Sequence, residues 1–359
     1  MAHPGRSNGA DVKPSAGSGP PSSGSGRIFL RSGLKETLTA LREAHISLPP
    51  NPVQAEFSID SNRAPWDRPL FELIETVNKV QLESANGLQR LLREPLVAAY
   101  DESIRKFAAL EGTAYLASHS LVVSDHNAYV PQVLLSFHFY TKAKDVANAH
   151  PELQYSENPT RTSEEDYMDD RIWFLKESLP RGALLFVDGP LIAGDAYTRM
   201  ISAIPELHAR DVLPVFVVKN SESDMVIRNL TSISGRYNSD LHWANHSLGQ
   251  GERTPLFRYT DQHNPKNSKV FCYLKALYGF PLRIEFHPTS LERFRDRALG
   301  SLDIANYLAL AQGDNWNPQL RYIAVAEMFA RSAIRLIDVN RFARGFHLTP
   351  TIDQTRFGG

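Results

Sequence analysis

The 359-residue sequence lacks the features that mark secreted, membrane-spanning and nucleotide-hydrolysing proteins. Cys272 is its single cysteine, which excludes a disulfide framework and a zinc site built from cysteines and is typical of a reducing compartment. No run reaches the roughly 18 apolar residues that cross a bilayer. The N-terminal stretch lacks the apolar segment of a secretory signal, and no glycine-rich P-loop is present. We therefore expect a cytoplasmic protein with no membrane contact.

The charge of the chain is balanced, with 39 basic and 40 acidic side chains and a formal net charge of -1. The molecule as a whole therefore exerts no net attraction on nucleic acid, and any such binding needs a local patch. Residues 1–26 are dominated by Gly, Ser, Pro and Ala. We predict a disordered tail over 1–26, a single domain over 27–350 and a C-terminal tail over 351–359.

Three short apolar segments end on a charged side chain. The run "LLFVD" is followed by Gly-Pro, which predicts a buried strand ending at Asp188. The segment "AEFSID" alternates apolar and polar residues and predicts an earlier strand ending at Asp60. The run "LPVFVVK" predicts a third strand ending at Lys219. Because ligands bind at strand ends in α/β sheets, these side chains are candidates for a functional site.

Helical patterns separate these strands. Residues 70–112 have helical spacing with breaks near Gly87 and Pro95, which predicts a helical insertion after the first strand. Residues 114–140 are rich in β-branched and aromatic side chains and predict a pair of strands. The segment "TSEEDYMDDRIWFLKESL" predicts a helix with acids in its first turns, leading into the strand that ends at Asp188. The predicted fold class is α/β, with a mixed sheet flanked by helices.

If the fold brings together the acids at two strand ends and on one helix, these acids can form a metal site. Carboxylates alone can hold divalent metals that prefer oxygen ligands, such as Mg²⁺ or Mn²⁺. Two such ions about 3.5–4 Å apart support phosphodiester hydrolysis. The alternative is that the helix acids only complement the helix dipole and that Asp-Gly only makes a turn. The spacing alone leaves both interpretations open.

Several motifs in order resemble the NurA nucleases. "FSIDSN" and "LLFVDGPL" are similar to the family's first and second aspartate motifs, and "VLPVFVVKNSES" to the strand that follows. "PLRIEFHP" and "NPQLRYIAVAEMFARSAIRL" resemble the closing strand and the final helix, so the resemblance spans about 55–340. It implies an RNase H-like fold, manganese-dependent cleavage of single-stranded DNA and duplex ends, and a homodimer. It also implies a partnership with a HerA-type hexameric ATPase in end resection of double-strand breaks.

The resemblance also implies roles for individual residues. Asp60 and Asp188 match the family's two strand aspartates, which implies that both bind the metal. The helix before Asp188 is expected to supply a further ligand. The candidates there are Asp170 or Asp169, with Glu165 one turn earlier. Ser61 stands where the family usually has glycine, and the predicted insertion at 70–112 interrupts the expected hairpin. These departures leave Asp125, in "LVVSDHN", as an alternative first-strand acid.

Two further positions complete the predicted catalytic set. Lys219 is expected to contact a phosphate or the developing negative charge. Glu327 stands where the family's final helix usually has a histidine, and a carboxylate can replace imidazole on Mn²⁺ or Mg²⁺. For DNA contact, we expect basic and aromatic residues of two loop-like segments to pair with phosphates and stack on bases. These residues are Arg236, Tyr237, Trp243, Arg258, Tyr259 and Lys266.

Two other functions are consistent with the sequence. One is a nuclease-derived scaffold that binds DNA ends or the translocase without cutting, which the altered first motif and the replaced histidine favour. The other is a metal-dependent phosphohydrolase that acts on small molecules. The polarity of cleavage and the preference for DNA or RNA are not encoded in these motifs.

Overall fold

The computed structural model describes residues 71–338 except 125–127, 150–152, 231, 234 and 262–263, together with the isolated positions 39 and 341. The chain divides into two compact units, residues 1–49 and 50–359, and the description below concerns the second. The predicted tails over 1–26 and 351–359 lie outside the described residues, and so do Asp60 and Asp125.

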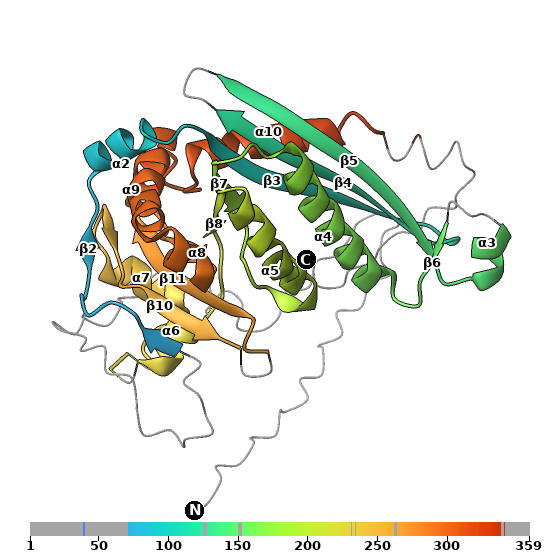
Figure 1. The fold of residues 1–359 in the computed structure, drawn as a ribbon. Helices are drawn as coiled ribbons and strands as arrows, with labels where there is room; N and C mark the ends of the chain where they lie inside the picture. Colours follow the sequence, from blue (N-terminus) through green and yellow to red (C-terminus); the bar gives the residue numbers. More distant parts are fainter. Residues whose placement is uncertain are drawn as a thin grey trace, which may run out of the picture. The chain divides into compact units, whose positions relative to one another are not determined.

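A mixed sheet forms the centre of this unit (Figure 1). In the described residues it contains twelve strands, and the order along its main path is β1-β10-β11-β12-β8-β7-β3-β4-β5-β6. The strands are β1 (Phe71–Leu73), β2 (Val80–Gln81), β3 (Val97–Ala108), β4 (Thr113–Ser124), β5 (Tyr129–Thr141), β6 (Gln154–Tyr155), β7 (Leu184–Asp188), β8 (Leu213–Val218), β9 (Glu252–Arg253), β10 (Phe257–Thr260), β11 (Ser268–Lys275) and β12 (Leu282–Phe286).

Helices pack on both faces of the sheet. They are α2 (Ser84–Leu91), α3 (Lys144–Ala149), α4 (Pro159–Ser178), α5 (Gly194–Ala209), α6 (Met225–Asn229), α7 (Asp240–Ser247), α8 (Pro288–Arg293), α9 (Arg295–Gln312) and α10 (Arg321–Ile334). One core lies between β3, β7 and β8 and the helices α9 and α10, and a second lies between the other face of these strands and α4 and α5 (Figure 1). No helix among the described residues is both long and apolar enough to cross a membrane.

The strand arrangement is RNase H-like, as predicted. β3, β4 and β5 are antiparallel neighbours, while β7 pairs in parallel with β3 and β8 in parallel with β7. The predicted strands ending at Asp188 and near Lys219 are β7 and β8. Their residues are almost entirely apolar because parallel strands with helices on both faces have no solvent-facing side. The predicted strand pair at 114–140 is β4 and β5.

The helical insertion predicted over 70–112 is wrong. The described part of this range contains one helix, α2, and the long strand β3. The sequence of β3, "VAAYDESIRKFA", is rich in residues that favour helices, but β4 pairs with all twelve of its residues and β7 with the first four. Tertiary pairing therefore overrides local propensity in this segment. β3 holds the position of the first strand in the RNase H-like arrangement.

The helix predicted before Asp188 is α4, and its N-terminus shows why it begins where it does. The side chain of Asn158 accepts a hydrogen bond from the backbone N–H of Arg161, and Pro159 occupies the first turn. Both features are typical of helix N-termini. The helix ends at Ser178, and β7 begins at Leu184.

Candidate active site

Two aspartates lie side by side on neighbouring parallel strands. Tyr100 of β3 is paired in register with Val187 of β7, so the next residues, Asp101 and Asp188, occupy equivalent positions. Both side chains fall on the face covered by α9 and α10, because side chains alternate along a strand and the adjacent Tyr100 and Val187 belong to the opposite core. After Asp188 the chain turns at Gly189, whose φ of 98° lies in the left-handed region that favours glycine.

Lys219 and Glu327 complete a charged cluster with Asp188. The Lys219 ammonium lies 2.8 Å from Oδ2 of Asp188 and 3.6 Å from Oε2 of Glu327. It also donates a hydrogen bond of 2.9 Å to Oε1 of Gln319, just before α10. Arg331, one turn further along α10, pairs with the other carboxylate oxygen of Glu327. The structure thus brings together three residues that the sequence singled out, although they lie far apart in the chain.

Burial changes the proton affinity of the two aspartates. Burial, together with the negative charge of Asp188, raises the pKa of Asp101 to about 8 against the opposing charge of Lys219. Burial also raises the pKa of Asp188, where Lys219 again opposes the effect. Burial alone would lower the pKa of Lys219, but the charge and hydrogen bond of Asp188 outweigh burial and raise it. Two carboxylates that lie close together and away from water favour the binding of a proton or a cation.

The same residues provide a test of whether the site suits a divalent metal. Among the described residues, no group of three His, Cys, Asp or Glu side chains is arranged to hold one. Oδ2 of Asp101, however, is buried without a hydrogen-bond partner. An unsatisfied buried carboxylate oxygen is costly unless a proton or cation compensates it. The oxygen donors of Asp101 and Asp188 therefore fit a hard cation such as Mn²⁺ or Mg²⁺.

Asp101 was not among the residues selected from the sequence, and neither was Glu102. Glu102 points to the opposite face of β3, where Arg171 of α4 lies 3.7 Å from its carboxylate and stacks over the ring of Tyr100 at 4.8 Å. The signal that could have found Asp101 is the apolar run "VAAY" before "DES", which parallels the apolar run before Asp188. The residues that follow it favour a helix, so the sequence pattern did not predict a strand at this position.

The predicted helix acids have partners elsewhere. Asp170 pairs with His138 of β5 at 2.9 Å, and Asp169 pairs with Arg199 of α5 at 2.5 Å. Glu165 also pairs with Arg199, at 3.2 Å, and with Arg161 at 3.0 Å. None of these ion pairs involves Asp101 or Asp188. The side chains that α4 buries instead include Tyr167, Met168 and Arg171. A metal-binding role for these three acids stays a prediction.

The structure corrects part of the predicted DNA-contact set. Tyr237 and Trp243 belong to a buried core formed with β10, β11, α6 and α7, and they are only 6% and 2% exposed. Their rings pack on the protein itself, so they are not available for base stacking. The segments expected to be loops form α7 and β10 in part. Apolar contacts across the sheet therefore account for these aromatic residues.

The remaining DNA-contact candidates are closer to the surface. Arg258 pairs with Glu72 of the neighbouring strand at 3.7 Å, and Tyr259 packs partly against the same core. Arg236 is half-buried, whereas Lys266 is exposed. Phosphate contact by these four residues stays a prediction.

Comparison with known proteins identifies the family. The model of the NurA domain matches residues 113–309, a segment that contains Asp188 and Lys219. A search of curated proteins found no match. Among solved structures, the chain is similar to the NurA nuclease from Sulfolobus solfataricus, with 9% identity, a TM-score of 0.42, and coverage of 70% of this chain and 85% of that chain.

Two other solved structures also match. One is endonuclease V from Ciona intestinalis in complex with inosine-containing DNA, with 14% identity, a TM-score of 0.34, and coverage of 70% of this chain and 96% of that chain. The other is Argonaute from A. aeolicus, with 11% identity, a TM-score of 0.35, and coverage of 68% and 30%. The family assignment depends on the domain match alone. Because that match covers more than half of the chain, the protein belongs to the NurA domain family.

Proposed function

We propose that this protein is a metal-dependent nuclease that hydrolyses phosphodiester bonds in single-stranded DNA and at duplex ends. The observation that carries the proposal is the placement of Asp101 and Asp188 at equivalent positions of two parallel strands. Membership of the NurA domain family and the RNase H-like strand order support it. In this proposal Asp101 takes the first-strand role that the sequence motifs assigned to Asp60.

The residues of the cluster have distinct roles in this proposal. Asp101 and Asp188 hold Mn²⁺ or Mg²⁺ through their carboxylate oxygens. When bound, such an ion supplies an activated water and stabilises the leaving oxygen of the phosphodiester. Lys219 orients Asp188 through their 2.8 Å contact, and its charge is placed to attract a phosphate group. Glu327 in turn holds Lys219 from α10.

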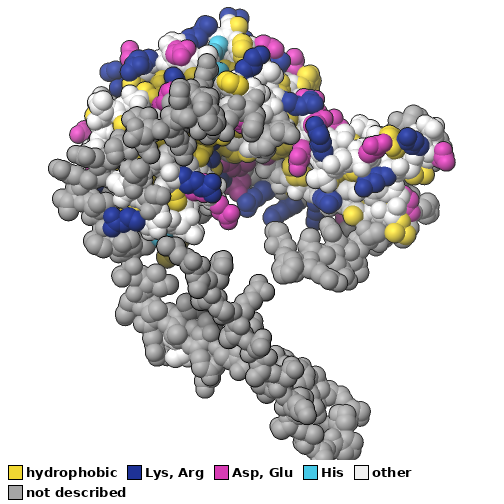
Figure 2. All heavy atoms as spheres, turned by 90° about the horizontal axis from the view of Figure 1, so that it is seen from below, with side chains coloured by type: hydrophobic (Ala, Val, Ile, Leu, Met, Phe, Trp, Pro, Cys, Tyr) yellow, Lys and Arg dark blue, Asp and Glu magenta, His cyan; other side chains and the backbone are white. Residues whose placement is uncertain are grey.

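The net charge and the side chains on one face of the molecule (Figure 2) indicate no general attraction for a polyanion such as DNA. Basic and acidic side chains are interspersed over the face shown in Figure 2, in keeping with the formal net charge of -1. DNA binding by this protein would therefore depend on particular basic side chains near the site and not on a uniformly positive surface.

The cellular role follows from the family resemblance. We propose that the protein is cytoplasmic, forms a homodimer and acts with a HerA-type hexameric ATPase in resection of double-strand break ends. The sequence contains no P-loop, so energy for strand separation would have to come from such a partner.

The test is an assay of purified full-length protein on end-labelled single-stranded and blunt duplex DNA. Reactions contain Mn²⁺, Mg²⁺ or a chelator. Asp101→Asn and Asp188→Asn are assayed beside Asp145→Asn, a matched change at an exposed aspartate of α3. We expect metal-dependent degradation by the wild type and by Asp145→Asn, with none by the other two variants. Absence of degradation by the wild type with every metal would contradict the proposal.

A second candidate function is a scaffold that binds DNA ends or the translocase without cutting. The favouring observation is that Lys219 lies within ion-pair distance of Asp188 and Glu327, where its ammonium already compensates the carboxylates. The same assay separates the two functions. A scaffold would bind labelled DNA in a mobility-shift measurement but would degrade none of it with any metal.

A further inference from the structure

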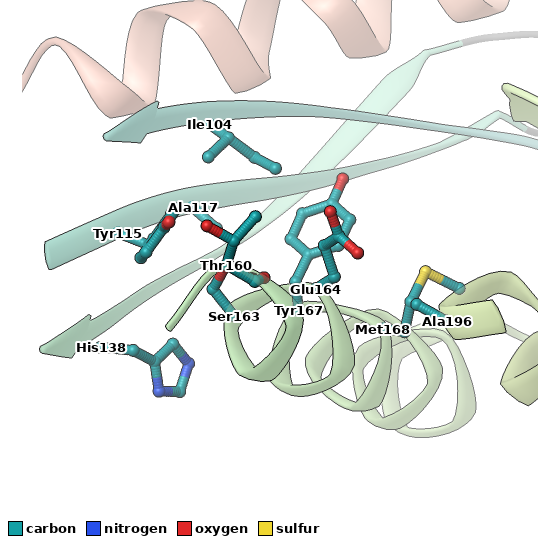
Figure 3. A pocket seen from close by; sticks show the side chains of 10 residues that line it. All are labelled: Ile104, Tyr115, Ala117, His138, Thr160, Ser163, Glu164, Tyr167, Met168 and Ala196. Atoms are coloured by element: carbon teal, nitrogen blue, oxygen red, sulfur yellow. Dashed lines mark hydrogen bonds between the residues drawn. The ribbon is translucent and has the colours of Figure 1, made fainter. Parts of the chain in front are cut away.

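Two serine side chains of β4 are buried on the face of the sheet that carries Asp101. Tyr115 and Ala117 of the same strand line a cavity of about 320 Å³ on the opposite face, against α4 (Figure 3). Because side chains alternate along a strand, Ser118 and Ser120 point away from this cavity. Both serines are fully buried. Their hydroxyl groups therefore lie on the same side of the sheet as the proposed metal site.

Helix α10 covers this part of β4. Leu116 forms a buried contact group with Ile334 of α10, and Val122 belongs to the core that includes α9 and α10. Ser118 and Ser120 lie between these two residues on the same face of the strand. The two hydroxyl groups are thus enclosed by the helix that also contributes a carboxylate to the charged cluster.

Ser120 is the cross-strand neighbour of Asp101. The two residues are directly paired in the antiparallel register of β3 and β4, and the Cβ atoms of such a pair are about 4.5–5.5 Å apart. Ser118 is paired instead with Ser103, two residues further along β3. On its other side, Ser120 is paired with Val133 of β5, whose side chain has no hydrogen-bonding group. Of the two serines, Ser120 is therefore the one placed beside the carboxylate of Asp101.

Both members of this pair have an unsatisfied oxygen. In the part of the chain that the structure describes, neither Oδ2 of Asp101 nor Oγ of Ser120 has a hydrogen-bond partner. A buried hydroxyl or carboxylate oxygen without a partner costs free energy. Carboxylate oxygens bind hard cations, and a serine hydroxyl binds Mg²⁺ in nucleotide-binding loops. One cation that contacts both oxygens would therefore compensate both.

We propose that Ser120 is a ligand of the cation held by Asp101 and Asp188, and that its hydroxyl supplies a neutral third oxygen. The inference rests on the proposed nuclease function and adds a protein ligand to its metal site. Among the described residues, no three His, Cys, Asp or Glu side chains are arranged to hold a metal. A hydroxyl ligand lies outside that set of residue types. The remaining positions on the cation are left for water and substrate phosphate, as is usual for Mg²⁺.

The first experiment measures Mn²⁺ binding to the full-length protein without DNA, from the electron paramagnetic resonance signal of free Mn²⁺. Ser118→Ala is the matched control for Ser120→Ala, because Ser118 is equally buried and equally unpartnered among the described residues but is not paired with Asp101. We expect Ser120→Ala to bind Mn²⁺ about 10–100-fold more weakly, as is typical for groups that support a metal site. Ser118→Ala should bind Mn²⁺ like the wild type. Equal affinity in both variants, or no Mn²⁺ binding by the wild type, would overturn the inference.

Unfolding temperatures separate a metal ligand from a residue that only packs. In chelator, Ser120→Ala should be at least as stable as the wild type, because it removes a buried hydroxyl that makes no hydrogen bond. Added Mn²⁺ should raise the unfolding temperature of Ser120→Ala less than that of the wild type, since stabilisation by a ligand depends on its affinity. A variant that is destabilised in chelator but gains as much from Mn²⁺ as the wild type would contradict the proposal.

A change of metal preference tests direct contact with the cation. Thiolate ligands favour soft cations such as Cd²⁺ over hard cations such as Mn²⁺. Ser120→Cys should therefore bind Cd²⁺ more tightly and Mn²⁺ more weakly than the wild type, whereas Ser118→Cys should keep the wild-type preference. The native Cys272 is buried and is common to all three proteins, so it does not contribute to the difference. An unchanged preference in Ser120→Cys would show that Ser120 does not contact the cation.

These outcomes are distinct from those of the nuclease assay. If DNA is degraded in a metal-dependent reaction but Ser120→Ala binds Mn²⁺ like the wild type, the proposed function stands and the inference on Ser120 fails. If Mn²⁺ binding depends on Ser120 but no metal supports degradation, Ser120 is a metal ligand in a protein that does not cut DNA.

Discussion

At the scale of single residues, the central interaction is the contact between Lys219 and Asp188. Both side chains are less than one-fifth exposed, so the ammonium is held in an environment where its interaction with a carboxylate is stronger than in water. The contact joins the ends of two adjacent parallel strands and extends to Glu327 of α10. A single lysine therefore links the three structural elements that surround the proposed site.

We predict that Lys219→Met lowers the rate of DNA degradation by about 10–100-fold, because groups that orient a metal-binding side chain typically contribute that much. The rate constant for end-labelled DNA with saturating Mn²⁺ is the measurement. Lys176→Met is the matched control, since Lys176 forms a 2.7 Å ion pair with Glu206 on the surface. An unchanged rate for Lys219→Met would show that Asp188 needs no such partner.

A second prediction at this scale distinguishes Asp101 from Asp60 as the metal-binding aspartate of the first strand. Asp101→Asn should abolish degradation, whereas Asp60→Asn should leave it unchanged, because the strand paired with β7 carries Asp101. Both variants are assayed at equal concentration after their unfolding temperatures have been compared. Loss of activity in Asp60→Asn with full activity in Asp101→Asn would restore the assignment made from the sequence motif.

At the scale of secondary-structure elements, a buried network of charged side chains on β11 and β12 holds the loops that follow β7 and β8. Glu285 of β12 is fully buried and accepts hydrogen bonds from Lys269 and Arg283 at 2.6 and 2.8 Å. It also accepts a hydrogen bond of 2.8 Å from the backbone N–H of Leu191. Leu191 lies in the loop after Asp188. Arg283 also donates a hydrogen bond of 2.5 Å to Ser221, two residues after Lys219. β12 thus fixes the loops that follow both β7 and β8.

We predict that Glu285→Ala lowers the free energy of unfolding by about 3–5 kcal/mol, since it leaves two buried cations without their carboxylate. Burial already lowers the pKa of Lys269, so loss of its partner would favour the neutral amine. Denaturant unfolding measures the change, with Glu206→Ala at the surface pair as the control, expected to cost under about 1 kcal/mol. A similar small effect in both variants would be inconsistent with the buried network.

The contact between α2 and α9 gives a prediction on packing. A Cβ atom at Gly87 would lie 2.2 Å from the backbone carbonyl oxygen of Asp303, so the two helices approach closely there. Gly87→Ala should destabilise the protein by about 1–3 kcal/mol, although alanine is the better helix former by about 1 kcal/mol. At Gly300 the nearest atoms belong to the flexible end of Arg90, so Gly300→Ala is expected to cost less. Thermal unfolding of both variants tests the order.

At the scale of the whole molecule, stability should depend on pH through buried histidines. His119 is fully buried, its Nδ1 lies 2.6 Å from the hydroxyl oxygen of Tyr100, and burial lowers its pKa to about 4. Burial likewise lowers the pKa of His208 to about 4. The folded protein keeps both rings neutral at a pH where the unfolded chain, with the ordinary pKa of about 6.5, has bound protons. Each of these two histidines therefore lowers the free energy of unfolding as the pH falls from about 6.5 to about 4.

We predict that the free energy of unfolding falls less steeply with acid in His119→Gln than in the wild type. The difference in slope should approach about 1.4 kcal/mol per pH unit for the one proton involved. Denaturant unfolding at several pH values between 7 and 4.5 provides the slopes. Parallel curves would show that His119 takes up a proton in the folded protein at its ordinary pKa.

The sequence by itself determined the parts of the fold in which every local signal agrees. β7 and β8 are short, apolar and bounded by breakers because they are buried on both faces. That pattern predicted their strand ends, and with them Asp188 and Lys219. The same holds for β4 and β5, where β-branched and aromatic residues dominate. The resemblance of ordered motifs predicted the family that the domain match confirms.

Only the tertiary structure decided which groups face these two residues. β3 carries Asp101 on a segment whose composition favours a helix, and its strand conformation depends on hydrogen bonds to β4 and β7. Tyr237 and Trp243 were predicted to contact DNA, but they are buried by strands and helices that no local pattern places beside them. The acids of α4 pair with His138 and Arg199 because the orientation of a helix is set by packing and not by its own spacing. Contacts between residues distant in the chain are a property of the folded structure, and local sequence patterns do not encode them.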